Sequence, residues 1–389
     1  MNQVIPAIGK ALHEFAGFPY MCSLLKSYPF AEQINVLCIG KSAYPMALAA
    51  TNTLNQLGID YSGYLLTKYQ HAPQPVPKLI TLEAGHPLPD QNSVTHSREI
   101  MTWLKSLSPK SELLILLSGG GSALFEIPAT GFTLTDVINA NKSLLVSGLS
   151  IAEMNRKRQA MSAVKQGKAL NATKAGKVLC LALSDVADND PAVIASAPFY
   201  PSDAKRLSSS HYYYANPELG QVLDYHIIGD NLSLLNTLKP YLKGEAIIHQ
   251  PYCSINVDCF AAYLADFAIT NRDGAFHLWG GETPLKVIGD GYGGRCTHLA
   301  LDFAIRIAGQ KGISLTCYAS DGNDNLASVA GAYVDGNTCN KLKDKGIDAA
   351  TYLCQCDSYS ALKAIGAIIP AFPNRINVND LFVLHSKAL

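Results

Sequence analysis

The chain has 389 residues, too many for one ordinary hydrophobic core, so we expect two domains. Lys and Arg together number 31, as do Asp and Glu, so the net charge at neutral pH is about zero. This balance argues against a nucleic-acid-binding surface, and the 48% apolar content excludes a disordered chain. The low charged fraction, 16%, favours a large interior and a buried subunit interface, from which we expect a homodimer.

The N-terminal segment lacks the continuous apolar core of a signal peptide, and no stretch approaches the roughly 18 apolar residues of a membrane span. The ten cysteines include no CxxC pair, which favours free thiols in a reducing compartment. We therefore expect a cytoplasmic protein without a membrane partner.

The first half alternates short apolar runs with helical patterns. Strands are expected at 36–39, 61–67, 113–117 and 178–183, with a helix at 43–57. Because the runs are continuously apolar, their strands should be buried on both faces. Strand, turn, helix and strand in this order predict an α/β fold with a Rossmann-like, doubly wound and mostly parallel sheet.

A long helical region is expected at 133–170. The chain then turns polar and aromatic at 208–217, before a strand at 224–228. We place a domain boundary there, which gives an N-terminal domain at 1–228 and a smaller α/β C-terminal domain at 229–389.

The second half repeats the alternation. Strands are expected at 276–279, 285–288 and 313–319, with a helix at 297–308. The final apolar piece, 381–384, is another expected strand.

The strongest local signal is the sequence Ser-Gly-Gly-Gly-Ser, which follows the strand at 113–117. Glycines let backbone N–H groups turn toward one point and form an anion nest, and serines add hydroxyl donors. A tight structural turn is the alternative. We expect a phosphate to bind Ser118, Gly119, Gly120, Gly121 and Ser122.

Gly289, Gly291 and Gly294 spell GxGxxG between an expected strand and an expected helix. This pattern favours a dinucleotide-dependent oxidoreductase as an alternative function. The nearest acidic residue at a following strand end, Asp321, comes later than the fingerprint requires. Arg295, directly after the glycines, instead suits a clamp for phosphate or carboxylate.

Several charged residues follow the expected strands. Lys41 lies just beyond the first strand, where an open α/β sheet binds its ligands. Asp185 and Asp321 each begin an acidic turn, where a carboxylate can hold Mg²⁺ or take a proton from a hydroxyl. Aspartate is also common in structural turns.

Asn155, Arg158, Ser162 and Lys165 are spaced to share one face of a helix, either beside a cleft or as a solvated flank. His86 lies in a proline-rich loop, for which a structural role is the simpler interpretation.

These blocks, in this order, resemble glycerate 2-kinases of the MOFRL-domain type, some of which carry the older name hydroxypyruvate reductase. The resemblance runs from Gly40-Lys41 to Asn379-Asp380. It rests on the ordered blocks GKSAYPMA, EAGHPLPD, LSGGGSAL, SGLSIAEMNRKRQAMSAVKQGKAL, LSDVADNDPAVIASAP, GGETPLKV, GYGGRCTHLALDFA, SDGNDNLASVAGAYVD and NVNDL.

The resemblance implies an enzyme that uses ATP and Mg²⁺ to phosphorylate the 2-hydroxyl of D-glycerate or a related small hydroxy acid. It implies Lys41 and Arg295 as cations of the active site, with Asp185 as a further catalytic residue. Asp185 and Asp321 are the expected metal ligands. Further residues are expected near the phosphates or nucleotide (Gly291, Gly293, Gly294) and near the substrate (His86, Asn155, Arg158, Lys165, Glu282).

The sequence departs from the family pattern at several positions. His298 stands where a glutamate is usual, and Ser-Asp-Gly-Asn-Asp-Asn at 320–325 replaces Thr-Asp-Gly-Ile-Asp-Gly. Residues 159–160 and 374–376 also differ. A hydroxypyruvate reductase using NAD(P)H and a catalytically degenerate binding protein therefore stay as alternatives.

Overall fold

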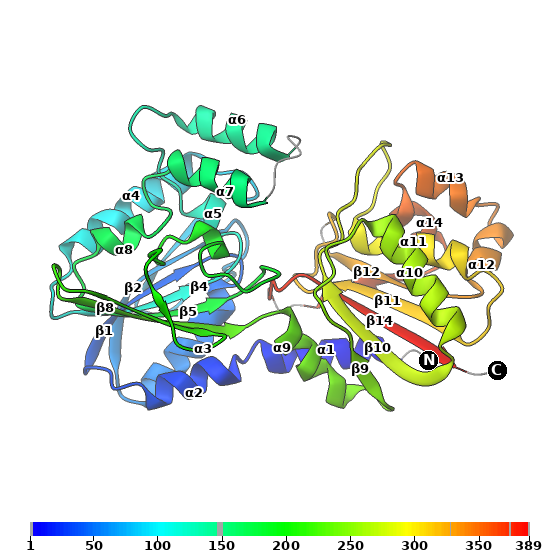
Figure 1. The fold of residues 1–389 in the computed structure, drawn as a ribbon, viewed down its shortest axis with the longest axis horizontal. Helices are drawn as coiled ribbons and strands as arrows, with labels where there is room; N and C mark the ends of the chain where they lie inside the picture. Colours follow the sequence, from blue (N-terminus) through cyan, green and yellow to red (C-terminus); the bar gives the residue numbers. More distant parts are fainter. Residues whose placement is uncertain (1–2, 146–150, 327, 373–374, 388–389) are drawn as a thin grey trace. The chain divides into compact units, whose positions relative to one another are not determined.

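A computed structural model describes residues 3–145, 151–326, 328–372 and 375–387 (Figure 1). The chain divides into two compact units. One, Gly17–Asp230, contains an eight-stranded sheet, and the other, Met1–Ala16 with Asn231–Leu389, contains a six-stranded sheet. Among the described helices, none has both the length and the apolar character needed to cross a bilayer.

The eight-stranded unit has the strand order β3-β2-β1-β4-β5-β8-β7-β6. Its strands from β3 to β8 are parallel neighbours, while β7 and β6 form antiparallel pairs at one edge. The strands are β1 (Gln33–Ile39), β2 (Asp60–Lys68), β3 (Leu79–Ala84), β4 (Glu112–Leu117), β5 (Lys177–Leu183), β6 (Lys205–Arg206), β7 (His211–Asn216) and β8 (Gln221–Gly229).

Helices lie on both faces of this sheet (Figure 1). They are α2 (Pro19–Ser27), α3 (Ala43–Gln56), α4 (Gln91–Ser106), α5 (Gly121–Leu124), α6 (Leu134–Leu145), α7 (Ile151–Ala160), α8 (Lys168–Ala172) and the 3₁₀ turn η1 (Ile194–Ser196). The predicted doubly wound, mostly parallel sheet is confirmed. The helical region predicted at 133–170 contains the helices α6, α7 and α8.

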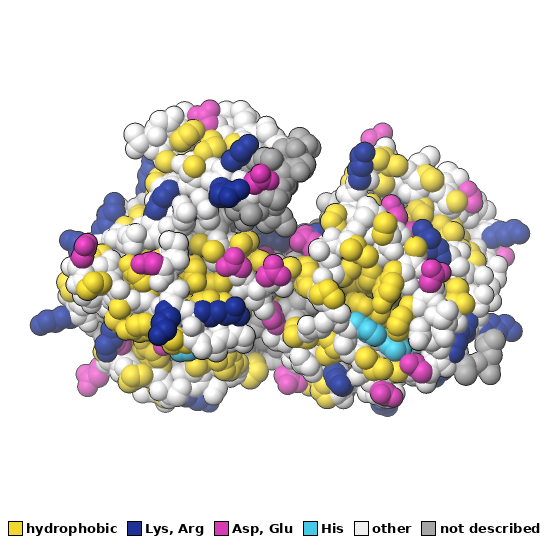
Figure 2. Space-filling view, viewed as in Figure 1, with side chains coloured by type: hydrophobic (Ala, Val, Ile, Leu, Met, Phe, Trp, Pro, Cys, Tyr) yellow, Lys and Arg dark blue, Asp and Glu magenta, His cyan; other side chains and the backbone are white. Residues whose placement is uncertain are grey.

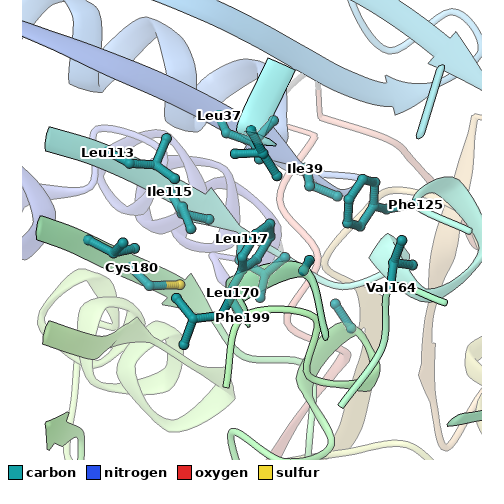
Figure 3. Packing of buried hydrophobic residues seen from close by; sticks show 14 of the residues in the cluster. Leu37, Ile39, Leu113, Ile115, Leu117, Phe125, Val164, Leu170, Cys180 and Phe199 are labelled. Carbon is teal, nitrogen blue, oxygen red and sulfur yellow. The ribbon is translucent and has the colours of Figure 1, made fainter. Parts of the chain in front are cut away.

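The central strands form the core because both of their faces are covered. Every residue of β4 is buried. Leu37, Ile115 and Leu117 belong to one buried cluster with Phe125 and Phe199 (Figure 3). Each fully buried leucine contributes about 1.5–3 kcal/mol relative to an exposed one, so this layer holds the strand ends in fixed positions.

The six-stranded unit has the order β13-β12-β11-β14-β10-β9. Here β9 and β10 are parallel, whereas the other neighbouring strands are antiparallel. The strands are β9 (Ala246–Ile248), β10 (Asp273–Gly281), β11 (Ile313–Ala319), β12 (Val329–Asp335), β13 (Ile368–Pro370) and β14 (Asp380–Lys387). The sheet of this unit is therefore mixed and mainly antiparallel.

The helices of this unit are α1 (Val4–Phe15), α9 (Asn231–Leu238), η2 (Lys239–Tyr241), α10 (Val257–Thr270), α11 (Arg295–Arg306), α12 (Thr338–Asp344), α13 (Ala349–Cys354) and α14 (Ser358–Ala364). The predicted strand at 381–384 is confirmed as part of β14, which lies between β10 and β11. The predicted strand at 285–288 is wrong, because these residues belong to the irregular segment between β10 and α11.

Positive and negative side chains are interspersed on the face of the molecule that Figure 2 shows. This mixture agrees with the equal numbers of basic and acidic residues in the sequence, 31 of each.

Candidate active site

The eight-stranded sheet changes its winding direction between β1 and β4. After β1 the chain builds β2 and β3 on one side, and it then returns to place β4 and β5 on the other. In open α/β sheets, ligands bind outside the carboxyl ends of the strands at such a switch point. The loops that follow β1 and β4 therefore occupy the expected position for a ligand.

These two loops are joined by hydrogen bonds. The Lys41 N–H donates to the carbonyl of Gly119 over 2.8 Å. The Ser42 N–H donates to Oγ of Ser118 over 3.0 Å, and the N–H of Ser118 donates to the carbonyl of Ile39 over 2.9 Å. Lys41, the predicted cation, therefore lies directly beside the Ser118–Ser122 loop, the predicted phosphate cradle.

The two loops approach each other closely around Gly120. Its φ of +84° is a left-handed conformation that favours glycine. A Cβ atom there would lie 2.9 Å from Cγ of Lys41 and 3.1 Å from Cδ2 of His86. The glycine therefore lets the Lys41 and His86 side chains approach the loop from the β1 and β3 ends of the sheet.

His86 is held in the loop after β3 by a local capping interaction. Asp90 caps helix α4 by accepting the Ser93 N–H over 2.8 Å, which ends the proline-rich loop. Burial, together with the positive charge of Lys41, lowers the pKa of His86 to about 3. His86 is therefore a neutral hydrogen-bonding group at neutral pH, and the cation in this cluster is Lys41.

The loop from Gly119 to Ser122 presents backbone donors. Within the described residues, its four N–H groups have no backbone acceptor, while the carbonyls of Gly119, Gly120 and Gly121 accept bonds from the chain around them. Backbone N–H groups that face one point beside a cation form a nest that suits an anion. This arrangement can hold the oxygens of a phosphate.

A left-handed turn fixes one side of the nest. Ala195, Ser196 and Ala197 have φ values of +49°, +61° and +58°. Such conformations cost about 1–2 kcal/mol per residue and persist where the surroundings enforce them. The Ser196 hydroxyl shares a 2.8 Å hydrogen bond with the Ser122 hydroxyl. The turn was not predicted, since alanine and serine give no signal for left-handed backbone.

Asp185 follows β5, which lies next to β4, so it belongs to the same edge of the sheet. Its side chain is partly buried. Asp188, in the same turn, is exposed. Asp185 is thus less exposed than Asp188, and its predicted catalytic and metal-binding roles stay predictions.

Lys165 and Arg158 do not share one helix face, because α7 ends before Lys165. The Lys165 side chain is 2% exposed and forms an ion pair with Glu126, whose side chain is 1% exposed. Arg158 donates from Nε to Oδ1 of Asn141 over 2.9 Å. Both cations therefore have partners within the protein. Their predicted role in binding the substrate stays a prediction.

Asn155 lies in α7, but its side chain is outside the described residues, as are residues 373–374 from the block that departs from the family pattern.

A second cluster of charges lies in the six-stranded unit. Arg295 begins α11, Glu282 follows β10, and Asp380 begins β14. Because β14 runs antiparallel between β10 and β11, Asp380 lies opposite both Gly281 and Ala319. The Arg295 guanidinium pairs with Glu282, and its Nε lies 3.4 Å from Oδ2 of Asp380.

Asp380 is the more unusual member of this cluster. It is 2% exposed, and burial raises its pKa to about 8; the carboxylates of Asp324 and Glu282 add to the shift, and Arg295 only partly offsets it. For Arg295, burial lowers the pKa, but Asp380 and Glu282 outweigh that effect and raise it. Asp380 is not among the site residues predicted from the sequence, although the pair Asn379-Asp380 ends the last block of the family resemblance.

Asp324 has a structural task. It accepts the N–H groups of Cys296 and Thr297 and the Thr297 hydroxyl, each over 2.8 Å. It thereby caps the first turn of α11 and fixes the helix that begins with Arg295. Asp321, which follows β11, is partly buried and remains the candidate metal ligand of that turn.

The glycines at 289–294 pack against their own unit. A Cβ on Gly291 would lie 2.4 Å from Asp357, and one on Gly294 would lie 2.3 Å from Asp324. A Cβ on Gly293 would lie 2.3 Å from Ser358. Close packing explains these glycines, so their nucleotide-binding role stays a prediction. A dinucleotide-binding GxGxxG motif should directly follow a strand, and the residues before Gly289 form none.

His298 lies one turn after Arg295 and contacts a different element. Its Nε2 lies 3.3 Å from Oδ1 of Asp258 in α10. The residue that replaces the family's glutamate therefore has its own carboxylate partner.

Two family models match the chain in sequence order. The domain of unknown function DUF4147 covers residues 10–215, and the MOFRL family covers residues 275–380. The D-glycerate 2-kinase of Thermotoga maritima is 33% identical over 90% of this chain and 90% of its own length. This chain belongs to the MOFRL-type glycerate 2-kinase family.

Further members of the glycerate 2-kinase family agree in sequence and fold. A crystal structure of glycerate kinase from Thermotoga maritima matches with a TM-score of 0.83 at 30% identity, and covers 99% of this chain and 98% of that one. The glycerate 2-kinase of Pyrococcus horikoshii is 30% identical over 92% of this chain and 88% of its own length.

A relative from Agrobacterium vitis, 32% identical over 89% of this chain and 97% of its own, carries a hydroxypyruvate reductase name. Relatives of this chain therefore carry both names, and a solved structure that spans 99% of this chain carries the glycerate kinase name.

Proposed function

We propose that this glycerate 2-kinase family member transfers the γ-phosphoryl group of ATP to the 2-hydroxyl of D-glycerate or a closely related small hydroxy acid. The products are the 2-phosphorylated acid and ADP. The observation that carries the proposal is the nest at Gly119–Ser122, which lies beside Lys41 at the switch point of the sheet. A phosphate is the anion that this combination of N–H donors and one compact cation suits.

Phosphoryl transfer depends mainly on positioning and on stabilising charge at the transferred oxygens. The N–H groups of the nest and the ammonium of Lys41 would hold phosphate oxygens. Neutral His86, in contact with the same loop, would donate or accept a hydrogen bond without adding charge. Ser122, fixed by Ser196, would add a hydroxyl.

Arg295 would bind the carboxylate of the acid or the transferred phosphoryl group. The Arg295 side chain is 35% exposed, so an anion can reach it despite its contacts with Glu282 and Asp380. A protonated Asp380 leaves more of the Arg295 charge for that anion. A planar guanidinium can meet a carboxylate or a phosphate with two parallel hydrogen bonds, which would orient the substrate.

Asp185 would orient the substrate hydroxyl or accept its proton as the new oxygen–phosphorus bond forms and the bond to ADP breaks. The partly buried carboxylates of Asp185 and Asp321 also have the hard oxygen chemistry that Mg²⁺ prefers. When bound with ATP, Mg²⁺ supplies charge neutralisation at the phosphate oxygens.

The proposal is tested by measuring ADP release from ATP over a panel of small hydroxy acids, with and without Mg²⁺. D-glycerate should give the highest rate, and the 2-phosphorylated acid should accumulate with ADP. Lys41→Ala should lower kcat/KM by about 10²–10³-fold, the usual cost of losing one charge-stabilising group. ADP release no faster than the ATP-only background with every acid would sink the kinase proposal.

The reductase name of the Agrobacterium vitis relative justifies a second assay. A reductase would consume NADH or NADPH when given hydroxypyruvate, and it would not need ATP. A catalytically degenerate member would bind ATP or an acid, measured by calorimetry, and turn over neither. The expected homodimer stays a prediction that sedimentation can check.

A further inference from the structure

The hairpin of β7 and β8 carries three side chains with the chemistry of metal ligands. They are His211 in β7 and Asp224 and His226 in β8. Their ligand atoms all lie within 4.8 Å of one another, and within the described chain this is the one group of its kind. None of the three belongs to the phosphate nest or to the pairing around Arg295.

Strand geometry brings the three together. His211 lies directly opposite His226 in the antiparallel ladder. Asp224 precedes His226 by two positions, so both side chains leave β8 on the same face. The two imidazole rings stack with centroids 4.0 Å apart and an angle of 14° between their planes.

The ring nitrogens converge on one carboxylate oxygen. Nε2 of His211 lies 2.6 Å from Oδ1 of Asp224, and Nε2 of His226 lies 3.0 Å from the same atom. The side chains of His211 and Asp224 are 32% and 28% exposed, whereas that of His226 is 10% exposed. The cluster is therefore anchored in the sheet on one side and open to solvent on the other.

We propose that His211, Asp224 and His226 bind one divalent transition-metal ion of the zinc type. Two imidazole nitrogens and one carboxylate oxygen are a common ligand set for such an ion, and solvent can supply a fourth ligand. Nitrogen ligands favour Zn²⁺ and its transition-metal neighbours over Mg²⁺, so this ion is not the one that accompanies ATP. Binding across both strands would clip the hairpin at the edge of the sheet.

A hydrogen-bonded cluster without metal is the competing explanation, because Asp224 can accept an N–H from each imidazole. Ligands at about 2.1 Å around a tetrahedral ion lie about 3.4 Å apart, so the cluster must open by several tenths of an ångström to admit one. His211 and Asp224 have the exposure to move that far. Nδ1 of His226 has no partner in the described part of the chain, so no protein group locks its tautomer.

The test measures metal content directly. Full-length protein is treated with a chelator, incubated with ZnCl₂, desalted and analysed for zinc by mass spectrometry. The unmodified protein should retain about one zinc ion per chain. His211→Gln and Asp224→Asn should each lower the retained zinc at least several-fold, while His13→Gln, at an exposed position of α1, should not.

A second readout identifies the ligands and controls for folding. Co²⁺ bound in place of zinc should show visible d–d absorption without the intense sulfur charge-transfer band that a cysteine ligand would produce. Zinc should also raise the thermal midpoint of the unmodified protein but not that of His211→Gln, whose circular dichroism should be unchanged.

No zinc retained by the unmodified protein, or equal retention by the cluster variants, would overturn the proposal. ADP release needs none of these residues, so this result stands apart from the outcome of the kinase test.

Discussion

Arg295 and Asp380 meet at the end of the six-stranded sheet, with Nε of the guanidinium 3.4 Å from Oδ2 of a carboxyl group that is 2% exposed. The guanidinium also pairs with the more exposed Glu282. One cation therefore serves two acidic groups, and the buried one has a pKa raised to about 8. The charge that Arg295 offers to a substrate anion depends on whether Asp380 holds its proton.

Activity should therefore depend on pH through Asp380. Below pH 8, protonated Asp380 leaves Arg295 available, and as the pH rises through about 8 its ionisation adds a negative charge beside the guanidinium. We expect KM for the acid substrate to rise across this range. Asp380→Asn should remove this rise, as measured by KM for D-glycerate at pH values from 6 to 9. An identical KM profile in both proteins would contradict the assignment.

The same group should shape the pH dependence of stability. The folded pKa of Asp380 lies above the ordinary value of about 3.9, so its contribution is full below pH 4 and is lost as the pH rises toward 8. The maximal slope for one group is about 1.4 kcal/mol per pH unit. Denaturant unfolding between pH 5 and 8 should show a smaller decline in Asp380→Asn than in the unmodified protein.

Arg295→Lys should retain a positive charge but lose the planar pair of donors. We expect kcat/KM to fall by about 10²-fold or more, with the larger share in KM if Arg295 binds the acid's carboxylate. Steady-state kinetics with both substrates varied will separate kcat from KM. Arg306→Lys, on the same helix and paired with Asp302, is the matched control and should keep its activity.

Gly120→Ala should damage the phosphate nest. The added methyl group meets Lys41 and His86 at 2.9–3.1 Å and forces a left-handed alanine. We expect a stability loss of about 1–2 kcal/mol and a loss of activity of 10²-fold or more. Gly131→Ala provides the control, since Gly131 has a φ of +91° but nothing within 4 Å of the added methyl group. It should share the backbone cost and keep the activity per folded molecule.

The buried pair of Lys165 and Glu126 distinguishes a structural lysine from a substrate-binding one. Lys165→Met leaves Glu126 buried and unpaired, which should cost about 3–5 kcal/mol of stability. The double variant Lys165→Met with Glu126→Leu should recover much of that loss. If Lys165 is structural, the double variant also recovers turnover, measured by ADP release. Restored stability without turnover would instead support a substrate role for Lys165.

The sequence by itself determined β1, β2, β4, β5 and β8 of the eight-stranded sheet and the loops that follow them, whereas β3, β6 and β7 were not predicted. Continuous apolar runs, such as the one at 113–117, predict doubly buried strands because burial on both faces leaves no polar positions. Three adjacent glycines after such a run predict a tight turn with positive φ angles, because glycine adopts them without strain. Lys41 could be placed beside them because the carboxyl ends of parallel strands share one edge.

Tertiary structure alone decided which distant residues meet. Asp380 contacts Arg295 because β14 inserts between β10 and β11, and no local pattern states which strands will pair or in which direction. The same holds for His211, which faces His226 only through the register of an antiparallel hairpin. The tendency to form a strand or a turn depends on neighbouring residues, so it could be predicted from the sequence. Strand pairing and register depend on the packing of the whole sheet, so they could not.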